Sequence, residues 1–367
     1  MKTMKIGFDI RPTKVKGNGI ATYTSIIYKE LSHQNEGIYE FIDGPVDINH
    51  SLMAKAKFYW WNQVILPRKL RKEGFNIYHA TKELEMPYIK ACKYITTIHD
   101  VIPLILKEQY FTSKIRFFLF YQLKLWIAIK KADIIVTDSN HSKSDIIKHF
   151  GVDESRIRVV YNCIDERYKV LPDSEKLRIK SKFGISEDTN YILGIGANEY
   201  RKNSKSLIEA FEKYKADTKN NTKLVVIGKK WKYSEVEMAT SDIIYTGYVS
   251  DEDLVALYNG AMVFVFPSLY EGFGLPPLEA MHCGTPVITS NTTSLPEVVG
   301  EAAVLVEPES IDQIKDAIIK IENDNEFREN LIMKGFEQIK KFSKERTING
   351  IKNIYNELLE RKDGGEK

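Results

Sequence analysis

The sequence has few cysteines, no long hydrophobic run and little net charge, and each absence excludes a class of protein. Its three cysteines (Cys92, Cys163 and Cys283) are far apart and lack metal-ligand spacing, as is typical of reduced thiols in a cytosolic protein. No apolar run reaches the length of about eighteen residues that spans a bilayer. The charged start, MKTMKIGFDI, is unlike a signal peptide. A net charge of +3 is too small to indicate nucleic acid binding. We therefore expect a cytoplasmic protein.

The composition and length of the sequence are those of a globular chain with more than one domain. The 367 residues are 43% hydrophobic and 28% charged. A chain of this length exceeds one ordinary core. Strand and helix patterns alternate, which predicts an α/β protein with parallel sheets. A charged segment at 166–189 contains Pro172 and resembles a connector, so we predict domains at 1–166 and 167–345.

The stretch at 264–308 has the pattern of a ligand-binding edge of such a sheet. An apolar strand at 262–267 is followed by a glycine-bearing turn, a helix that begins at Pro276-Pro277 and ends near Gly284, and a strand at 287–289. The SLPE of 294–297 indicates another turn. A helix N-terminus that follows a glycine turn in an α/β sheet offers free N–H groups to an anion.

Two carboxylates belong to this stretch. Glu271 lies in the turn, and Glu279 lies near the start of the helix. A carboxylate near a helix N-terminus can also be a cap or a partner of the helix dipole, and for Glu279 the residues alone do not decide between these roles.

The motif E-G-F-G-L-P-P-L-E-A-M, continued by C-G-T-P-V-I-T-S and L-P-E-V-V-G, closely resembles the signature of glycosyltransferase family 4. These are retaining enzymes of the GT-B fold that use nucleotide sugars. The resemblance implies two Rossmann-like domains whose parallel sheets face each other across a cleft, with a C-terminal helix at 346–367 that crosses back to the first domain. It also implies that Glu271 contacts the donor sugar and that Glu279 binds the ribose. Further donor contacts would come from Gly272, Phe273, Gly274 and Leu275.

Near the N-terminus, Gly17-x-Gly19-x-x-Thr22 follows the first strand and almost matches the dinucleotide fingerprint. An NAD site is therefore an alternative. It is disfavoured because the third glycine is absent and the turn before Gly17 is long. In the family that the chain resembles, a glycine loop here lies over the donor phosphate, a role that would fall to Gly19.

A second candidate site is the His99-Asp100 pair, which ends the strand predicted at 94–98. Sites in α/β proteins form at the carboxyl ends of strands. The alternative is a turn capped by Asp100 beside a half-buried histidine. The phrase T-I-H-D-V-I-P is similar to the H-D-[LV]-x-P of the mannosyltransferase-like branch of family 4. That similarity implies that His99 and Asp100 act in catalysis, near the sugar and the acceptor.

Donor-binding residues are also predicted beyond the 264–308 stretch. Arg201 and Lys202 precede a helix predicted from Ser204, where they could form a diphosphate clamp or could simply be solvated. The resemblance places the R-K-N motif at the donor diphosphate and places Tyr248 and Val249 at the nucleotide base. The sequence departs from the family at Ala197, where many relatives have arginine, and at Cys163, where relatives have glycine.

No metal or other cofactor is expected. Asp251-x-Asp253 could suggest a metal site, but Ser250 with Asp253 is better explained as a capping box. The segment 107–131 combines six basic residues with Phe, Tyr, Trp and Leu, and a basic cluster occupies 68–72. The segment could be a core helix with snorkelling lysines or a helix that lies on anionic membrane.

The resemblance therefore implies a retaining hexosyltransferase of surface polysaccharide synthesis. The favoured donor is GDP-mannose, and the acceptor is a hydroxyl group of a glycan or lipid-linked glycan, with no nucleic acid partner. The alternatives are a UDP-sugar-dependent transferase of the same fold, a GT-B sugar-nucleotide epimerase, a retaining glycosidase and a non-catalytic nucleotide-sugar-binding protein. The membrane contact, where it exists, would be peripheral and at the inner face of the cell membrane.

Overall fold

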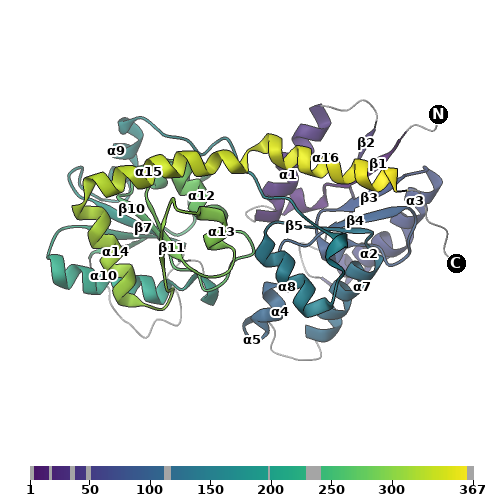
Figure 1. Cartoon of the computed structure of the whole chain (residues 1–367), viewed down its shortest axis with the longest axis horizontal. Helices are drawn as coiled ribbons and strands as arrows, with labels where there is room; N and C mark the ends of the chain where they lie inside the picture. The colour runs from purple at the N-terminus through teal and green to yellow at the C-terminus, as the bar shows by residue number, and fades with distance from the viewer. Residues whose placement is uncertain are drawn as a thin grey trace. The chain divides into compact units, whose positions relative to one another are not determined.

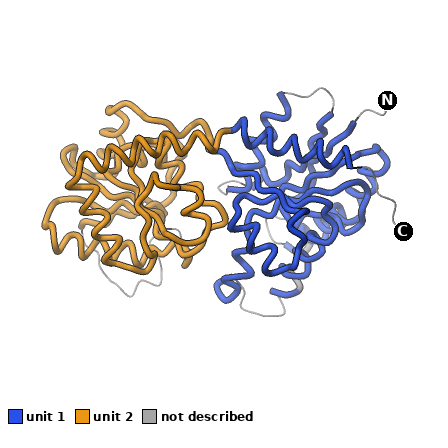
Figure 2. Tube along the Cα trace, in the orientation of Figure 1, with its two compact units in different colours: residues 1–163, 344–367 blue, residues 164–343 orange. Residues whose placement is uncertain are grey.

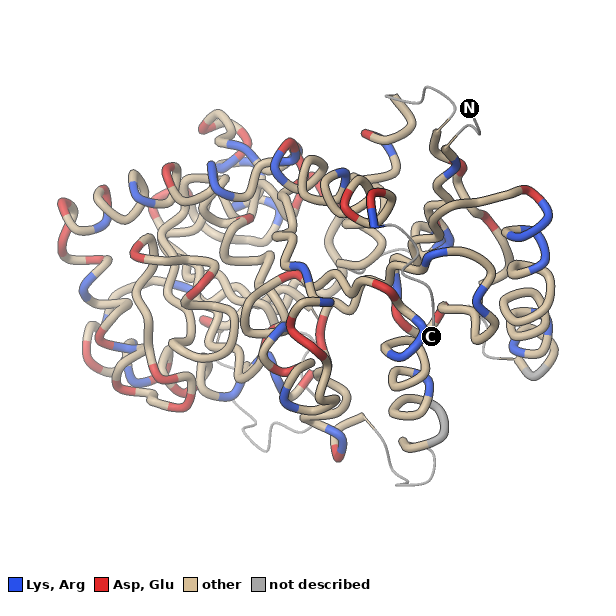
Figure 3. Tube along the Cα trace, turned by 45° about the vertical axis from the view of Figure 1, so that its right-hand side comes forward, with Lys and Arg blue, Asp and Glu red and all other residues tan. Residues whose placement is uncertain are grey.

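The chain divides into two compact units. The computed structural model describes residues 4–15, 19–33, 38–46, 51–110, 117–196, 199–228 and 241–361. Unit 1 comprises residues 1–163 and 344–367, and unit 2 comprises residues 164–343 (Figure 2). These bounds lie a few residues from the predicted ones. Basic and acidic residues are interspersed over both units (Figure 3), which agrees with the small net charge.

In its described residues, unit 1 contains a six-stranded parallel sheet with the order β2-β1-β3-β4-β5-β6. Its strands are β1 (Ile6–Asp9), β2 (Tyr39–Ile42), β3 (Ile77–Ala80), β4 (Lys93–Thr97), β5 (Ile134–Thr137) and β6 (Ile157–Val159). The central strand β3 was not predicted, because it is short and His79 interrupts its apolar pattern. His79 is nevertheless fully buried.

Helices cover both faces of this sheet (Figure 1). On one face, α1 (Gly19–His33) and α16 (Lys344–Glu360) pack on β1, β3, β4 and β5. On the other face lie α3 (Leu66–Lys72), α7 (Leu123–Lys131) and α8 (Asn140–Phe150). Shorter elements connect them: η1 (Arg11–Lys14), α2 (Leu52–Trp60), η2 (Trp61–Ile65), η3 (Glu83–Glu85), α4 (Ile102–Ile105), α5 (Lys107–Tyr110), η4 (Phe118–Gln122) and η5 (Glu154–Arg156).

The C-terminal helix α16 is joined to the unit 1 sheet by a buried hydrogen-bonded histidine. The two ring nitrogens of His79 lie 2.8 Å from the Tyr355 hydroxyl and 2.9 Å from the Thr97 hydroxyl. Burial lowers the pKa of His79 to about 3, so the ring is neutral at physiological pH. A neutral imidazole has one donor and one acceptor, which two hydroxyl groups can satisfy.

The described residues of unit 2 form a second parallel sheet, of six strands in the order β12-β11-β10-β7-β8-β9. Its strands are β7 (Tyr191–Ile195), β8 (Lys223–Ile227), β9 (Ile243–Tyr245), β10 (Val263–Phe266), β11 (Val287–Ser290) and β12 (Val304–Val306). The helices and turns are α9 (Asp173–Lys182), η6 (Tyr200–Lys202), α10 (Ser204–Thr218), α11 (Asp251–Gly260), α12 (Leu275–His282), α13 (Leu295–Val299), α14 (Ile311–Asn323), α15 (Asn325–Ile339) and η7 (Lys340–Phe342). Helices α10 and α14 pack side by side on one face (Figure 1).

Local sequence signals account for much of this unit, with two exceptions. Gly284 ends α12 with a φ of 72°, as predicted, and the Ser250 side chain caps α11. Residues 294–297, predicted as a turn, instead begin the short helix α13. The edge strand β12 was not predicted either, because its three residues are too few to show a period. Among the described residues, no helix has the length and apolarity needed to cross a membrane.

The buried His79–Tyr355 contact makes the docking of α16 testable. Tyr355→Phe should lower the free energy of unfolding by about 1–3 kcal/mol, because it leaves one buried nitrogen of His79 without a partner. The half-buried Tyr39 provides a matched control, and Tyr39→Phe should cost less. Denaturant unfolding followed by circular dichroism measures both. Equal stability of the Tyr355→Phe variant and the wild type would contradict this account of the contact.

Candidate active site

One carboxylate, that of Glu271, joins two cations at the edge of the unit 2 sheet. Arg201 and Lys202 lie in η6, which follows β7, and Glu271 follows the neighbouring strand β10. The Lys202 Nζ is 2.8 Å from Glu271 Oε1, and the Arg201 Nη1 is 2.7 Å from Glu271 Oε2. The structure therefore brings together three residues that the sequence predicted as separate donor contacts.

This ion-pair cluster is buried. The side chain of Glu271 is 9% exposed, that of Lys202 is 10% exposed, and that of Arg201 is 16% exposed. Burial alone would raise the pKa of Glu271, but the charges of Lys202 and Arg201 outweigh it and hold that pKa below its usual value. The Ser268 hydroxyl also donates a hydrogen bond of 2.8 Å to Glu271. Glu271 is therefore an anion at neutral pH. The two cations are not simply solvated, because they already contact a carboxylate.

Hydroxyl groups from neighbouring elements hold the loop that carries Glu271. The carbonyl oxygen of Arg201 accepts a hydrogen bond from the Leu269 N–H (2.7 Å) and lies 2.9 Å from the Ser268 hydroxyl oxygen. The Ser294 hydroxyl, at the start of α13, donates its one proton to the Phe273 carbonyl (2.7 Å) and lies 3.0 Å from the Glu271 carbonyl oxygen. Sequence reasoning missed Ser268 and Ser294, since a serine in a loop or turn shows no sign of its distant partner.

The glycine turn leads into α12 as the sequence predicted, but the helix offers fewer N–H groups than a helix N-terminus usually does. Gly272, Phe273 and Gly274 are buried, and Leu275 is the first helical residue. Gly274 has a φ of 109°, and a side chain there would approach Leu295 to 2.7 Å. The next two residues are prolines, so within the first four helical positions only Leu275 and Leu278 carry an N–H. An anion at this helix would depend mainly on Arg201 and Lys202.

Glu279 lies in an environment different from that of Glu271. It is half-buried in α12, and the Tyr258 hydroxyl donates a 3.0 Å hydrogen bond to its Oε2. Burial raises the pKa of Glu279, and hydrogen bonds from Tyr258 and Tyr168 oppose this effect only in part. The two acids are therefore held at different pKa values by burial and by their partners. Neither tyrosine was predicted as a site residue, because each lies on another element of the unit.

The predicted base-binding residues follow β9. The side chain of Tyr248 is 92% exposed, and Val249 is half-buried. The neighbouring carboxylates are ion-paired, Asp251 with Arg167 and Asp253 with Arg178 (3.0 Å) and Lys182. In the described part of the chain, no group of His, Cys, Asp and Glu has an arrangement that could hold a metal ion.

In unit 1, His99 follows β4 and contacts Asp138, which follows the neighbouring strand β5. Its Nδ1 is 2.7 Å from Asp138 Oδ2, and its Nε2 is 3.2 Å from the carbonyl oxygen of Thr81. The Asn162 side chain donates a 3.0 Å hydrogen bond to the same oxygen of Asp138, and the ring of Tyr23 packs edge-on against His99 at 4.9 Å. Asp138 was predicted only as part of a helix start. The signal that could have identified Asp138 as a site residue is that it follows a predicted strand, as His99 does.

The two acceptors make His99 a cation. Burial alone would lower its pKa, but the charge of Asp138 outweighs burial and raises the pKa of His99 to about 9. Both ring N–H groups then donate, one to the Asp138 carboxylate and one to the Thr81 carbonyl. A doubly protonated ring has no lone pair with which to accept a proton, so His99 can supply positive charge but does not serve as a base in this arrangement.

The remaining residues that the sequence analysis singled out have fewer contacts with the site. Asp100 is half-buried and accepts a 2.9 Å hydrogen bond from the Ile102 N–H, which caps the start of α4. Gly19 is the exposed first residue of α1. Gly17 and, in unit 2, Ala197 lie outside the described residues. Cys163 is buried and does not adopt a positive φ, so this turn has no conformational need for the glycine found in relatives.

Comparisons with known proteins agree with this fold and show the family. A profile described as Glycosyl transferases group 1 matches residues 175–338, and one described as Glycosyltransferase Family 4 matches residues 27–168. The O-antigen chain mannosyltransferase B of Escherichia coli is 32% identical over 385 residues, which cover 95% of this chain and 100% of that protein.

Among solved structures, the fold is similar to that of two proteins of low sequence identity. Sucrose-phosphate synthase of Thermosynechococcus elongatus is 18% identical with a TM-score of 0.74, and the match covers 97% of this chain and 99% of that one. HepE of Anabaena, in complex with UDP-glucose, is 17% identical with a TM-score of 0.71, covering 96% and 100%. With two six-stranded parallel sheets, the fold is GT-B.

The charged state of His99 predicts a pH dependence of stability. Its folded pKa of about 9 lies above the unfolded value of about 6.5. The ion pair with Asp138 should therefore contribute full stability below about pH 6.5 and lose it as the pH rises to about 9, with a slope of up to about 1.4 kcal/mol per pH unit. Denaturant unfolding between pH 6 and 9.5 measures this slope.

The variant His99→Gln provides the control for this measurement, because other groups such as the thiols also titrate in the unfolded chain near the upper end of the range. The difference in unfolding free energy between wild type and His99→Gln should shrink as the pH rises. A difference that stays constant across the range would contradict a charged His99.

Proposed function

We propose a function for this chain from one premise: it belongs to the glycosyltransferases of group 1 and family 4 and is a hexosyltransferase of the GT-B fold. It would transfer mannose from GDP-mannose to a hydroxyl group of a surface glycan, with retention at the anomeric carbon. The observation that carries the proposal is the buried cluster of Glu271, Arg201 and Lys202 at the carboxyl edge of the unit 2 sheet. The E. coli relative, named as an O-antigen chain mannosyltransferase, supports the choice of sugar and of a glycan acceptor.

The proposed reaction requires stabilisation of a departing nucleoside diphosphate. Arg201 and Lys202 supply two positive charges in a buried setting, where fixed charges act more strongly than in water. When the diphosphate is present, these cations would be shared between its oxygens and Glu271. Glu271 keeps its negative charge and would face the positive charge that develops on the sugar. We propose that no metal ion takes part in this step.

We propose that transfer occurs on one face of the sugar. The bond between the anomeric carbon and the phosphate oxygen breaks, and the acceptor hydroxyl oxygen forms its bond to the same carbon on the same face. The acceptor proton passes to the departing phosphate oxygen, so no side-chain base is needed. The charge state of His99, which leaves no ring nitrogen free to accept a proton, is consistent with this assignment.

The other predicted residues would bind the substrates. In unit 2, Glu279 would accept hydrogen bonds from the ribose hydroxyls, held in place by Tyr258, and the exposed Tyr248 with Val249 would contact the base. The loop Gly272–Leu275 would contact the donor. In unit 1, His99 and Asp100 would act in catalysis near the sugar and the acceptor, and Gly19 would contact the donor phosphate.

A UDP-sugar is the alternative donor, and it is favoured by the fold neighbour HepE, which is described in complex with UDP-glucose. The purified protein should release GDP from GDP-mannose in the presence of EDTA and should transfer mannose to O-antigen-type acceptors, as followed by mass spectrometry. Activity with UDP-glucose alone would establish the alternative donor. Loss of activity in EDTA, with recovery in Mn²⁺, would contradict the assignment of charge stabilisation to Arg201 and Lys202.

The two glutamates should affect different kinetic constants. Glu271→Gln should lower kcat by about 10²-fold, or about 2.7 kcal/mol, because it removes a charge that acts in the transition state. Glu279→Gln should mainly raise the KM for the donor, because ribose contacts are similar in the ground and transition states. Steady-state kinetics with varied donor measures both constants.

The exposed Glu301 offers a control, and Glu301→Gln should behave as wild type. Glu271→Gln also leaves two buried cations with less countercharge, so its melting temperature should be measured alongside to show that the fold persists. A change confined to KM in both active-site variants would contradict the assigned roles.

We also propose that unit 1 binds anionic membrane, with the inner face of the cell membrane as the expected location. In α7, the residues Leu125, Ala128 and Ile129 face the core, while Trp126 on the outer side is 48% exposed. Phe118 in η4 is 50% exposed, and Trp60 in α2 is 58% exposed. Exposed aromatic residues among lysines suit a membrane interface. The predicted segment 107–131 is thus α5, η4 and α7, and its residues 111–116 lie outside the described part of the chain.

Binding to phosphatidylserine-containing liposomes tests this contact. Affinity should fall as salt is added, since each basic residue near the surface contributes about 1 kcal/mol. Trp126→Ala should weaken binding, whereas Met333→Ala, which removes an exposed apolar side chain of unit 2, should not. Equal binding to neutral and anionic liposomes, or binding to neither, would contradict a contact with anionic lipid.

A further inference from the structure

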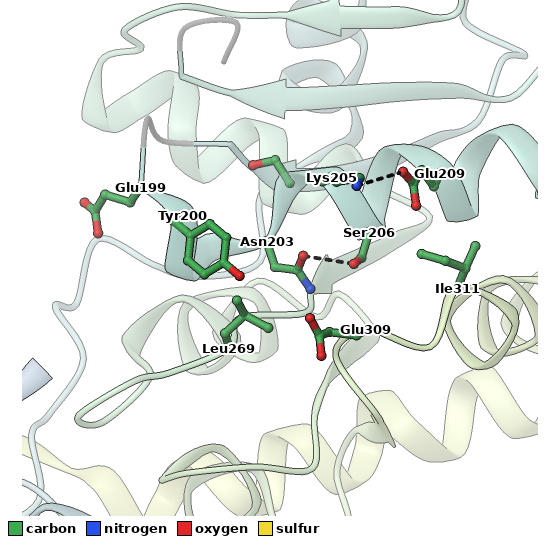
Figure 4. A pocket seen from close by; sticks show the side chains of 10 residues that line it. Glu199, Tyr200, Asn203, Lys205, Ser206, Glu209, Leu269, Glu309 and Ile311 are labelled. Atoms are coloured by element: carbon green, nitrogen blue, oxygen red, sulfur yellow. Dashed lines mark hydrogen bonds and ion pairs between the residues drawn. The ribbon is translucent and has the colours of Figure 1, made fainter. Parts of the chain in front are cut away.

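Unit 2 contains a cavity of about 280 Å³ that is distinct from the cluster of Arg201, Lys202 and Glu271. It opens beside the first turns of α10, and its side chains come from three separate parts of the unit (Figure 4). Its lining comprises Glu199, Tyr200, Asn203, Ser204, Lys205, Ser206, Glu209, Leu269, Glu309 and Ile311. The volume lies just below the range for small-ligand pockets, roughly 300–1,000 Å³, so the cavity would hold at most one small ligand.

The charges of the lining argue against an anionic ligand. Three of the described lining residues are glutamates, Glu199, Glu209 and Glu309. Glu199 pairs with Arg201 at 2.7 Å and Glu209 pairs with Lys205 of the lining at 3.8 Å, so the carboxylates exceed these cations by one. The negative excess would repel phosphate or sulfate. A metal ion is also disfavoured, because within the described residues no group of acids, histidines or cysteines is arranged to hold one.

The remaining features of the cavity suit a sugar ring. Tyr200 is 47% exposed, and with Leu269 and Ile311 it gives the cavity apolar surface (Figure 4). The carboxylate of Glu309 is a hydrogen-bond acceptor on the same cavity, whereas that of Glu199 already pairs with Arg201. A pyranose has an apolar face that can pack on an aromatic ring and a rim of hydroxyl groups that donate hydrogen bonds to carboxylates.

The floor of the cavity is fixed before any ligand arrives. Asn203 has a left-handed backbone with a φ of 53°, and its amide donates to the carbonyl groups of Pro267 (3.0 Å) and Pro308 (2.6 Å). The Ser206 hydroxyl donates to the oxygen of the same amide at 2.9 Å. One side chain thus ties the start of α10 to the ends of two strands. A preformed site loses less free energy on binding than one that must become ordered.

The cavity also shares its walls with the proposed donor site. Tyr200 precedes Arg201 in η6, and Leu269 lies two residues before Glu271. The Leu269 N–H donates to the Arg201 carbonyl at 2.7 Å, so the two sites have a common hydrogen-bonded support. A ligand in the cavity would therefore be held beside the groups assigned to the donor.

We propose that this cavity binds an uncharged sugar unit of the glycan substrate or product, other than the sugar that is being transferred. The proposal rests on the glycan acceptor of the proposed function and deepens it by assigning a second carbohydrate contact. The proposal has a consequence for binding affinity. Glycans long enough to fill the cavity should bind more tightly than a single sugar residue, and this preference should depend on Tyr200 and Glu309.

The test uses the full-length chain without donor and a neutral α-linked mannotriose as the probe. Isothermal titration and saturation-transfer NMR should detect binding to the wild type. Tyr200→Ala and Glu309→Ala should each weaken it by about five-fold, the change expected from losing one aromatic or hydrogen-bonded contact. Glu301→Ala, which removes an exposed carboxylate outside the cavity, is the matched control and should bind as wild type.

Release of GDP from GDP-mannose, measured on the same proteins, separates this proposal from the proposed function. Donor turnover without mannotriose binding would overturn the sugar site and leave the transferase assignment standing. Mannotriose binding that neither variant weakens would also overturn it, because the sugar would then bind elsewhere. Mannotriose binding that depends on Tyr200 and Glu309, in a protein that turns over no tested donor, would support the sugar site alone.

Discussion

The unit 2 site depends on one interaction, the pairing of the Glu271 carboxylate with the side chains of Lys202 and Arg201. Neither a buried acid nor two buried bases would remain charged in isolation, because the loss of water is too costly. Together they remain charged and fix the positions of η6 and of the loop after β10. Removing one partner from a buried ion pair costs about 3–5 kcal/mol, so the same contact links the stability of this edge to its chemistry.

Unit 1 uses the same physical principle with a different pair. Asp138 keeps His99 charged although the ring is buried, as its raised pKa shows. In contrast, His79 is buried without a carboxylate partner and is neutral. Both charged sites lie where the carboxyl ends of neighbouring parallel strands meet, β7 with β10 and β4 with β5. A parallel sheet brings together residues that are far apart in the chain at such an edge, and this is why the sites form there.

Prediction from the sequence succeeded where the signal was local. The strand, glycine turn and proline-initiated helix around Glu271 each carry their own signal, and the structure contains all three. Strands β3 and β12 were missed because they are short and, for β3, interrupted by His79. The sequence at the start of α13 indicates a turn, since only packing on the neighbouring elements stabilises a helix of five residues.

The sequence by itself determined the family, the α/β fold and the identity of Glu271, Glu279, Arg201, Lys202 and His99 as candidate site residues, because these depend on motifs of adjacent residues. The tertiary structure decided their partners and hence their charge states. Glu271 has a lowered pKa and Glu279 a raised one because different side chains surround them. Asp138 charges His99 only because β4 and β5 are neighbours in the sheet. Electrostatic energy depends on distance and burial in space, and neither can be obtained from separation along the chain.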